Sequence, residues 1–426
     1  MAKVKVQSVK GTRDLLPPDT AVWAAVEATA RRVFAAYGYG EIRTPILEET
    51  ELFVRGVGES TDIVGKEMYT FPDKKGRSLT LRPENTAAVA RAYVEHSMQQ
   101  LPAPLKLFYI GPQFRYERPQ QGRYRQFYQI GAELLGDPGP QSDAEVILLL
   151  VRFLSELGFP GLTVLINTVG DEASRSAYRE ALQAFLAPKA AHLGEDSRRR
   201  LETNPLRILD TKIPAERELL NGAPELVDFL SPESRQHFET VLAILQRFGV
   251  PHRVDSRLVR GLDYYTRTVF EIVASGLGSQ DAIVGGGRYD RLISDLGGPE
   301  VPGIGFAIGE DRLIDVLPEA FRRNVLPKPP VFVAALGGVD LGEALAVAEE
   351  LRAAGVAAVA ELASRSPKTA LKRADRLGAR LVILVGDDEQ AAGEVTFKNL
   401  ASGEQRRVPR SEVLQNVTGW TTEETA

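Results

Sequence analysis

The sequence predicts a protein of two domains, of which the larger has an α+β fold. Three observations lead to this prediction. A strand–turn–strand unit at 105–135 precedes long helical segments, strand character with many glycines returns at 258–316, and a β-α-β-α-β order begins at 331. The length of 426 residues agrees with more than one domain, since a domain has roughly 150 residues.

A proline-rich linker separates the two domains. The run Pro327-Lys328-Pro329-Pro330 marks it, because the pattern of strands and helices changes on either side. We therefore place the first domain at 1–325, the linker at 326–330 and the second domain at 331–426.

Periodicity predicts the elements of the first domain. Helical spacing of apolar residues indicates long helices at 17–40 and at about 141–157. The stretch at about 172–257 is rich in charged residues and helix formers, and we interpret it as a helical insertion. Strand runs occupy 105–110, 124–134 and 162–168, and turn residues at 119–122 join the first two.

The second domain is predicted to be a small α/β domain, because strands and helices alternate along it. They are a strand at 331–336, a helix at 341–354, a strand at 356–362, a helix at 367–377 and a strand at 381–385. In the second helix Lys368, Lys372 and Arg376 lie four apart on one face. This face is either a solvated surface or a contact for RNA phosphates.

The composition excludes several classes of site. The chain has no cysteine, which rules out disulfides, thiolate metal sites and cysteine nucleophiles. Its four histidines include no pair spaced for a helical metal site. No apolar run of about 18 residues and no secretion signal are visible, so we expect a cytoplasmic protein. With a formal charge of −5, a nucleic acid would have to bind at local basic patches.

The hairpin at 105–135 carries the densest chemical signal. Between 106 and 129 there are five basic residues and one acidic residue. Guanidinium groups such as those of Arg115 and Arg123 can hold phosphate oxygens bidentately. A solvated hairpin would explain any single arginine, but four arginines with interleaved aromatics favour a site for polyphosphate or RNA.

Two further segments carry polar candidates. Gln129 and Glu133 alternate on the return strand and share a face, which is either a small polar pocket or an exposed surface. Glu84 and Thr86 stand at a helix start after an Arg-Pro step. A carboxylate there either stabilises the helix N-terminus or binds a ligand ammonium, and the two roles are compatible.

The segment at 258–316 combines glycines with single arginines. Arg260 precedes two tyrosines that enter a strand, where aromatic residues are usually part of the core. The run Gly285-Gly286-Gly287 allows a ligand to approach the backbone closely. It has the spacing of neither a Walker loop nor a dinucleotide fingerprint. Gly303 to Leu313 is an apolar, glycine-rich strand followed by a helix that carries Arg312.

Together these stretches resemble a class II aminoacyl-tRNA synthetase, and specifically the histidyl-tRNA synthetase family. The arginine hairpin is similar to motif 2, Gly303 to Leu313 to motif 3, and Tyr39 to Pro45 to motif 1. The two histidine signatures of the family resemble Arg260 to Tyr265 and Gly285 to Asp290. Lys10 to Leu15 fits the family's N-terminus, so the resemblance covers essentially the whole chain.

The resemblance implies a fold, an activity and partners. The fold would be an antiparallel six-stranded catalytic sheet flanked by helices, followed by an α/β domain that reads the anticodon. The activity would be that of a ligase, which uses ATP and Mg²⁺ to convert histidine to histidyl-adenylate and then charges the 3′ end of tRNA(His). The protein would be a homodimer with motif 1 at its interface.

The resemblance also implies roles for single residues. Arg115 matches the arginine that holds the α-phosphate of ATP, Arg312 one near the γ-phosphate, and Arg123 one beside the ATP. Arg260 matches the family's catalytic arginine, which contacts the histidine carboxylate and the α-phosphate. The residues matched to histidine binding are Glu84, Thr86, Gln129, Glu133, Arg260, Tyr264, Tyr265 and Tyr289. Gln120 matches a loop that faces the tRNA acceptor end, and Asn85 departs from the glycine of many relatives.

Two other classes of protein remain as alternatives. A histidine-sensing paralogue, such as the regulatory subunit of ATP phosphoribosyltransferase, commonly lacks the anticodon domain and has eroded catalytic motifs. Here residues 331–426 and the arginines Arg115, Arg260 and Arg312 are present, which favours the enzyme. A kinase-linked tRNA sensor would need a kinase glycine loop or a His-Arg-Asp loop, and neither motif is visible.

Overall fold

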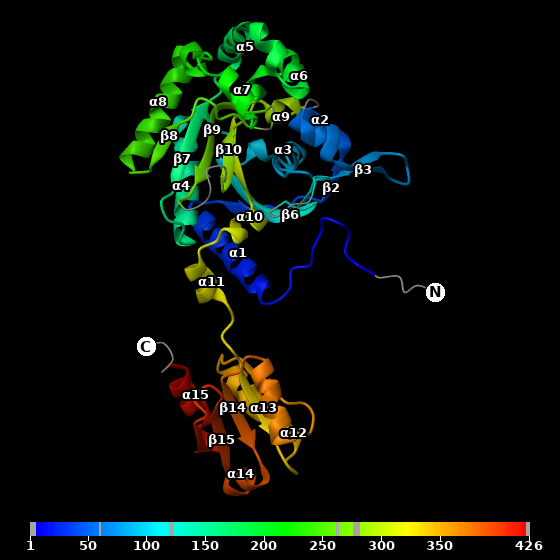
Figure 1. Cartoon of the computed structure of the whole chain (residues 1–426), viewed down its shortest axis with the longest axis vertical. Coiled ribbons are helices and arrows are strands. Elements are labelled where there is room, and N and C mark those ends of the chain that lie inside the picture. Colours follow the sequence, from blue (N-terminus) through cyan, green and yellow to red (C-terminus); the bar gives the residue numbers. More distant parts are fainter. Residues whose placement is uncertain are drawn as a thin grey trace. The chain divides into compact units, whose positions relative to one another are not determined.

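The structure, a computed structural model, describes residues 6–58, 61–118, 123–260, 262, 264–275 and 282–422. The chain forms two compact units, Met1–Val325 and Leu326–Ala426, each with its own sheet and core (Figure 1). The turn predicted at 119–122, which includes Gln120, lies outside the described residues.

The first unit is built on one large sheet. In the described part of this unit, eight strands have the order β1-β5-β6-β11-β10-β9-β7-β8. The short strands β1 (Gly40–Glu41) and β8 (His252–Val254) pair in parallel at the two edges. The inner six are antiparallel: β5 (Leu105–Phe114), β6 (Gln126–Leu135), β11 (Gly303–Gly309), β10 (Val284–Arg288), β9 (Thr266–Val273) and β7 (Thr163–Thr168). This architecture confirms the predicted α+β fold.

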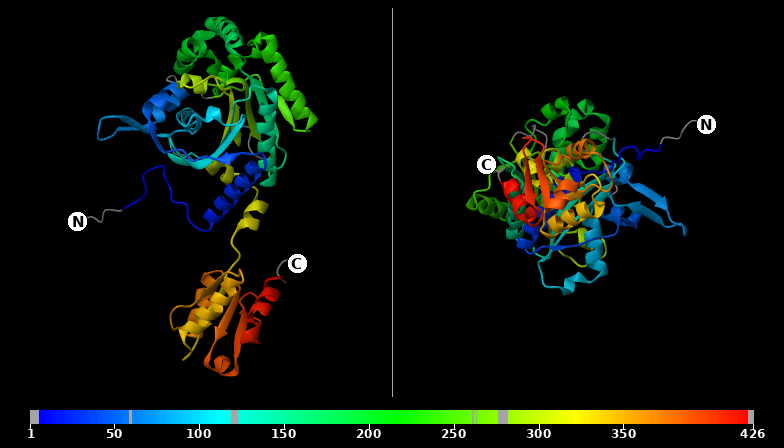
Figure 2. Two further views of the ribbon diagram at one scale, coloured as in Figure 1. Left: turned by 180° about the vertical axis from the view of Figure 1, so that it is seen from behind. Right: turned by 90° about the horizontal axis from the view of Figure 1, so that it is seen from below.

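Helices cover both faces of this sheet (Figure 2). Helix α1 ends at Ala36, because Gly38 adopts a φ of 82°, a left-handed conformation that stops a helix. The main core lies under α1 (Asp19–Ala36), α4 (Pro140–Glu156), α8 (Pro232–Arg247), α10 (Glu310–Asp315) and α11 (Glu319–Val325). The other face is covered by α2 (Thr50–Val57), α3 (Thr86–Glu95) and α9 (Leu292–Asp295).

The segment predicted as a helical insertion, at about 172–257, contributes to two cores. A separate core lies among α5 (Glu172–Leu186), α6 (Glu195–Thr203) and α7 (Pro214–Leu219). Helix α8 instead packs on α4, and its residues Phe238 and Leu245 are buried in the main core. The apolar spacing of α8 defines a buried face but does not say which core that face joins.

A small sheet that the sequence analysis did not predict positions the start of α3. Its strands are β2 (Leu47–Glu49), β4 (Ser78–Leu81) and β3 (Tyr69–Pro72), in that order. Strand β4 leads into Arg82, which donates hydrogen bonds to the carbonyl of Pro112 at 3.0 Å and that of Thr44 at 2.9 Å. These bonds fix the chain immediately before Glu84.

The second unit contains the predicted β-α-β-α-β order. Strands β12 (Val331–Ala335), β13 (Ala358–Ala360) and β14 (Leu381–Val385) are parallel, and α12 (Leu341–Ala353) and α13 (Pro367–Arg376) connect them. The unit continues with elements that were not predicted: α14 (Asp387–Ala392), β15 (Glu394–Asn399), β16 (Gln405–Pro409) and α15 (Val413–Thr422). Across the described residues of both units, we find no helix long and apolar enough to cross a membrane.

Candidate active site

Two cavities adjoin on the side of the large sheet that α3 covers. The larger, of about 280 Å³, is lined by arginines and is named the arginine cavity. The smaller, of about 200 Å³, is lined by four tyrosines and is named the tyrosine cavity. Both are bordered by Arg115, Gln129, Arg260, Gly285 and Ala307. A ligand that fills both cavities therefore passes beside two guanidinium groups.

The structure brings the described members of the predicted site together in this cleft. Arg123 and Arg312 line the arginine cavity, and Arg115 and Arg260 border both cavities. The tyrosine cavity contains Glu84, Thr86, Gln129, Glu133, Tyr264, Tyr265 and Tyr289. Gln120 belongs to the residues that the structure does not describe.

Glu133, near the end of β6, lines the tyrosine cavity. Its side chain is buried, Thr86 Oγ1 donates to Oε1 at 2.8 Å, and the Tyr289 hydroxyl donates to Oε2. Burial raises the pKa of Glu133 to about 8, although both hydrogen bonds favour the charged form. At neutral pH the carboxyl group is therefore largely protonated.

Glu84 precedes α3, and its carboxylate accepts hydrogen bonds from the N-terminus of that helix. One carboxylate oxygen accepts from the backbone N–H of Thr86 at 2.7 Å, and the other from that of Ala87 at 3.0 Å. Burial raises the pKa of this carboxyl group, and the two N–H groups oppose the rise. Of the two compatible roles expected for Glu84, the structure contains the stabilising contact with the helix, and the same carboxylate also lines the tyrosine cavity.

Arg115 and Arg260, which border both cavities, are each held in place by contacts with neighbouring residues. Arg115 donates from Nε to the carbonyl of Pro83 at 2.8 Å, and its guanidinium lies 5.2 Å from the ring centre of Phe127. Arg260 forms an ion pair with Glu271 of β9. These contacts orient both guanidinium groups within the cleft.

The glycine run of β10 has a role that the sequence analysis did not anticipate. We expected it to let a ligand approach the backbone, and Gly285 does line both cavities. However, a Cβ at Gly285 would also lie 2.0 Å from Arg260 Nη2, and one at Gly287 would lie 2.8 Å from the ring of Tyr265. The glycines therefore make room for the chain's own side chains.

Several residues that line the cleft were not predicted. Tyr124, Phe127, Glu117 and Glu271 line the arginine cavity, and Tyr109 lines the tyrosine cavity. The sequence contains one feature that could have indicated Tyr109. Gly131 is its partner across the β5–β6 pair, and a glycine leaves room for a large neighbouring side chain. A Cβ at Gly131 would lie 2.3 Å from the Tyr109 hydroxyl oxygen.

Fold and site together define a class of protein. A six-stranded antiparallel sheet, with a motif 2 hairpin in β5 and β6 and a motif 3 strand and helix in β11 and α10, is the catalytic fold of class II aminoacyl-tRNA synthetases. Arginines from the hairpin and from α10 line one cleft.

Comparisons with known sequences identify the family. A family model described as histidyl-tRNA synthetase matches residues 11–313, and one described as an anticodon binding domain matches residues 330–420. The histidine–tRNA ligase of Nitratidesulfovibrio vulgaris (strain DP4) is 51% identical over 410 residues, which cover 96% of this chain and 97% of the relative. That of Desulforudis audaxviator is 51% identical over 408 residues, with the same coverage. The chain belongs to the histidyl-tRNA synthetase family.

Solved structures agree with this assignment. The apo histidyl-tRNA synthetase of S. aureus has a TM-score of 0.80 at 38% identity, and the match covers 97% of this chain and 99% of that one. A Bacillus halodurans protein, described as an ATP phosphoribosyltransferase regulatory subunit/histidyl-tRNA synthetase, has a TM-score of 0.65 at 26% identity. That match covers 89% of this chain and 98% of the other.

Glu133→Gln is expected to make the stability of the protein less sensitive to pH. In the unfolded chain a glutamate ionises near pH ~4.3, whereas burial keeps Glu133 protonated up to about pH 8. The folded state therefore binds more protons in this window, and wild-type stability falls as pH rises through it. Urea denaturation at pH 5 and pH 8 should show a smaller fall for the variant.

The exposed Glu202 provides the control for this measurement. Glu202→Gln should leave the wild-type fall between pH 5 and pH 8 unchanged, since this side chain is in water in both states. If Glu133→Gln lost as much stability as the wild type over the same range, Glu133 would not be the buried acid described above.

Proposed function

We propose that the cleft activates histidine with ATP and transfers the histidyl group to the 3′ end of tRNA(His). The observation that carries this proposal is the meeting of two unlike cavities at Arg115 and Arg260. ATP occupies the arginine cavity and histidine the tyrosine cavity. The histidine carboxylate and the α-phosphate then meet beside both guanidinium groups.

The first step is an in-line displacement at phosphorus. The histidine carboxylate attacks the α-phosphorus, the bond to pyrophosphate breaks, and histidyl-adenylate forms. Negative charge gathers on the α-phosphate oxygens in the transition state, where cations placed in advance stabilise it more than the ground state. The contacts of Arg115 with Pro83 and of Arg260 with Glu271 orient these cations before substrate binds.

The tyrosine cavity supplies the selection for imidazole. A neutral imidazole has one N–H donor and one acceptor nitrogen, and a carboxyl group with neighbouring tyrosine hydroxyls can satisfy both. Glu133 and Tyr264 play these parts, while Glu84 and Thr86 face the amino group. A substrate without the two nitrogens leaves buried polar groups unpaired, a penalty that can give discrimination of ~10⁴–10⁵.

ATP enters as its magnesium complex. Within the described ranges there is no cluster of three or more His, Asp or Glu side chains that could hold a metal ion. The carboxylates of Glu117 and Glu271 line the arginine cavity, and such oxygen donors suit Mg²⁺ that also binds phosphates. When bound, the ion neutralises part of the polyphosphate charge.

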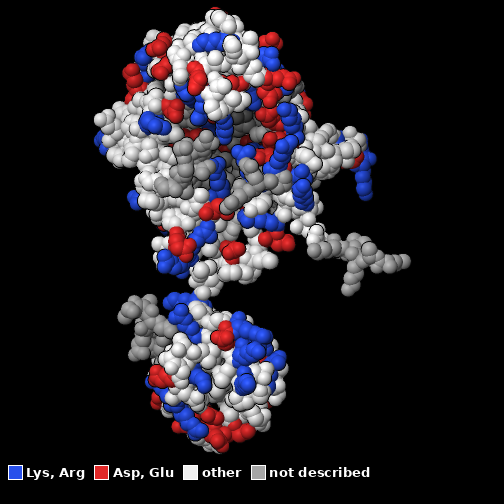
Figure 3. Space-filling view, viewed as in Figure 1, with Lys and Arg blue, Asp and Glu red and all other residues white. Residues whose placement is uncertain are grey.

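The second unit binds the anticodon arm of the tRNA in this proposal. Lysine and arginine side chains gather over α13 (Figure 3), and Lys368, Lys372 and Arg376 are all exposed there. Nearby, the buried carboxylate of Glu361 pairs with Arg365 and Arg373. A cationic helix face of this kind suits the phosphates of RNA, and it supports the RNA-binding interpretation of α13.

The enzyme acts as a homodimer in the cytoplasm, where tRNA is charged. Three apolar side chains on the small sheet, Ile46 before β2, Leu47 in β2 and Phe71 in β3, are 41 to 45% exposed. Ile46 and Leu47 directly follow the segment that resembles motif 1. A second copy that covered the three side chains would remove apolar surface from water.

Pyrophosphate exchange with ATP and Mg²⁺, measured with each of the twenty amino acids, tests the proposed reaction. Exchange is expected with histidine alone, because only its side chain satisfies the polar groups of the tyrosine cavity. Binding of histidine without exchange would assign the chain to the class of histidine sensors instead.

Arg260→Lys is expected to fold normally and to lose roughly 100-fold or more in the rate of adenylate formation. A single ammonium cannot reproduce the planar fork that faces both the carboxylate and the phosphate. Arg257→Lys, at an exposed position three residues earlier, is the matched control and should keep the wild-type rate. Wild-type exchange by Arg260→Lys would remove Arg260 from the catalytic residues.

Deletion of 328–426 should affect formation of histidyl-adenylate and charging of tRNA differently. The first unit has its own core and contains the whole cleft, so pyrophosphate exchange should persist. Charging of tRNA should fall, because the anticodon contacts are lost. Unchanged kcat/KM for tRNA in the truncated chain would refute the anticodon role of the second unit.

A further inference from the structure

Arg288, at the end of β10, is a buried cation with every donor engaged. The side chain has no exposed surface. Its Nε and Nη2 donate to Asp143 Oδ1, its Nη1 donates to Asp290 Oδ1 and to the carbonyl of Asp137, and its Nη2 also donates to the carbonyl of Gly139. These bonds use all five N–H groups of the guanidinium. A buried charge satisfied in this way fixes its surroundings, since any movement breaks a bond that water cannot replace.

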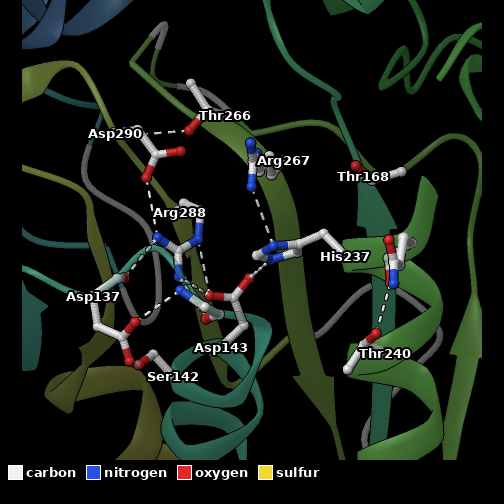
Figure 4. A network of polar contacts seen from close by, with 12 residues as sticks. Asp137, Ser142, Asp143, Thr168, His237, Thr240, Thr266, Arg267, Arg288 and Asp290 are labelled. Atoms are coloured by element: carbon white, nitrogen blue, oxygen red, sulfur yellow. Dashed lines mark hydrogen bonds and ion pairs between the residues drawn. The ribbon is translucent and has the colours of Figure 1, made fainter. Parts of the chain in front are cut away.

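The pair of Asp143 and Arg288 continues to helix α8 (Figure 4). The other carboxylate oxygen of Asp143 lies 2.8 Å from His237 Nε2, and Arg267 Nη1 lies 3.3 Å from His237 Nδ1. A guanidinium can only donate, so Nδ1 accepts and the ring proton is on Nε2, where it is donated to Asp143. Arg267 also pairs with Glu233 at the surface.

This network contacts two chain segments, one next to Tyr289 and one next to Tyr264 and Tyr265, which line the tyrosine cavity. Tyr289 stands between Arg288 and Asp290, and its hydroxyl donates to Glu133. The backbone N–H of Asp290 donates to Thr266 Oγ1 at 3.1 Å. Both neighbours of Tyr289 are therefore held by polar contacts that lie outside the tyrosine cavity.

The second segment, with Tyr264 and Tyr265, leads into an irregularity in β9. The pairing of β9 with β10 shifts register between Gly287 and Arg288, and Arg267 adopts a φ of 47°, which is unusual for a residue with a side chain. Arg267 is thus a strained position two residues after Tyr265. Its contact with His237 is one of the bonds that hold this conformation.

We propose that Asp143, His237, Arg267 and Arg288 form a positioning network for histidine binding, although none of them lines the tyrosine cavity. The network rests on the proposed function. It holds Tyr289 against Glu133. It also holds the bulge at Arg267, which is close in sequence to Tyr264 and Tyr265, so its side chains determine how well histidine fits. Its outermost buried member, His237, comes from a helix on the opposite face of the sheet.

His237→Leu tests this proposal in the full-length chain. Asp143 and Arg288 are unsuitable targets, since loss of either leaves a buried charge unpaired. Loss of the His237 bonds should raise KM for histidine about five- to tenfold in pyrophosphate exchange, with KM for ATP unchanged. His237→Gln should restore KM to within about twofold, because its amide can donate to Asp143 and accept from Arg267.

Ser234→Ala is the matched control on the same helix. Ser234 is buried and donates to Asp171 at 2.8 Å, so its loss should lower stability without changing either KM. If His237→Leu does not fold, Arg267→Gly replaces it, because glycine adopts the positive φ and lacks the guanidinium. Arg267→Gly should also raise KM for histidine alone.

Two outcomes would overturn the proposal, provided that the wild type shows histidine-dependent pyrophosphate exchange. One is a wild-type KM for histidine in whichever of the two variants folds, with only the melting temperature lowered. The other is an equal rise of both KM values, which would indicate general loosening of the cleft. A wild type without histidine-dependent exchange would instead contradict the proposed function itself.

Discussion

The floor of the cleft depends on glycines that leave space for long polar side chains. Neighbouring strands lie only about 4.8 Å apart and each Cβ projects from the sheet, so a carboxylate or guanidinium cannot lie low over ordinary residues. A Cβ at Gly305 would lie 1.7 Å from Glu133 Oε2, and one at Gly285 would lie 2.0 Å from Arg260 Nη2. The positions of these two glycines therefore determine where the acid and the cation of the cleft can lie.

The two ends of the cleft have different electrostatics. At the end formed by the arginine cavity, arginines stand beside carboxylates, with Arg260 paired to Glu271 and Arg123 Nη1 3.7 Å from Glu117 Oε2. Such pairing lowers the cost of keeping cations in the cleft without a polyanion. At the other end Glu133 receives hydrogen bonds from hydroxyl groups, and burial raises its pKa to about 8. One end suits a polyphosphate, and the other suits a polar ring without charge.

The same strands of the large sheet carry the main core on one face and the cleft on the other. Its inner strands bury apolar side chains against α1, α4 and α8 on one face and carry the cleft on the other. Most of this contact is apolar, but Asp143 of α4 and His237 of α8 bring polar groups to the end of β10. The helices of the main core can therefore influence the cleft through defined hydrogen bonds as well as through packing.

The sequence by itself determined the elements with strong periodicity, such as α1, α4 and the second unit from β12 to β14, and its motifs pointed to the residues that line the cleft. It did not reveal that α8 belongs to the main core, that Tyr109 fits over Gly131, or that Arg288 pairs with Asp143. Periodicity identifies the buried face of an element but not its partner, and Asp143 and Arg288 are 145 residues apart in the chain. Such contacts are decided only when the tertiary structure brings distant segments together, because burial then requires each polar group to find a partner within hydrogen-bond distance.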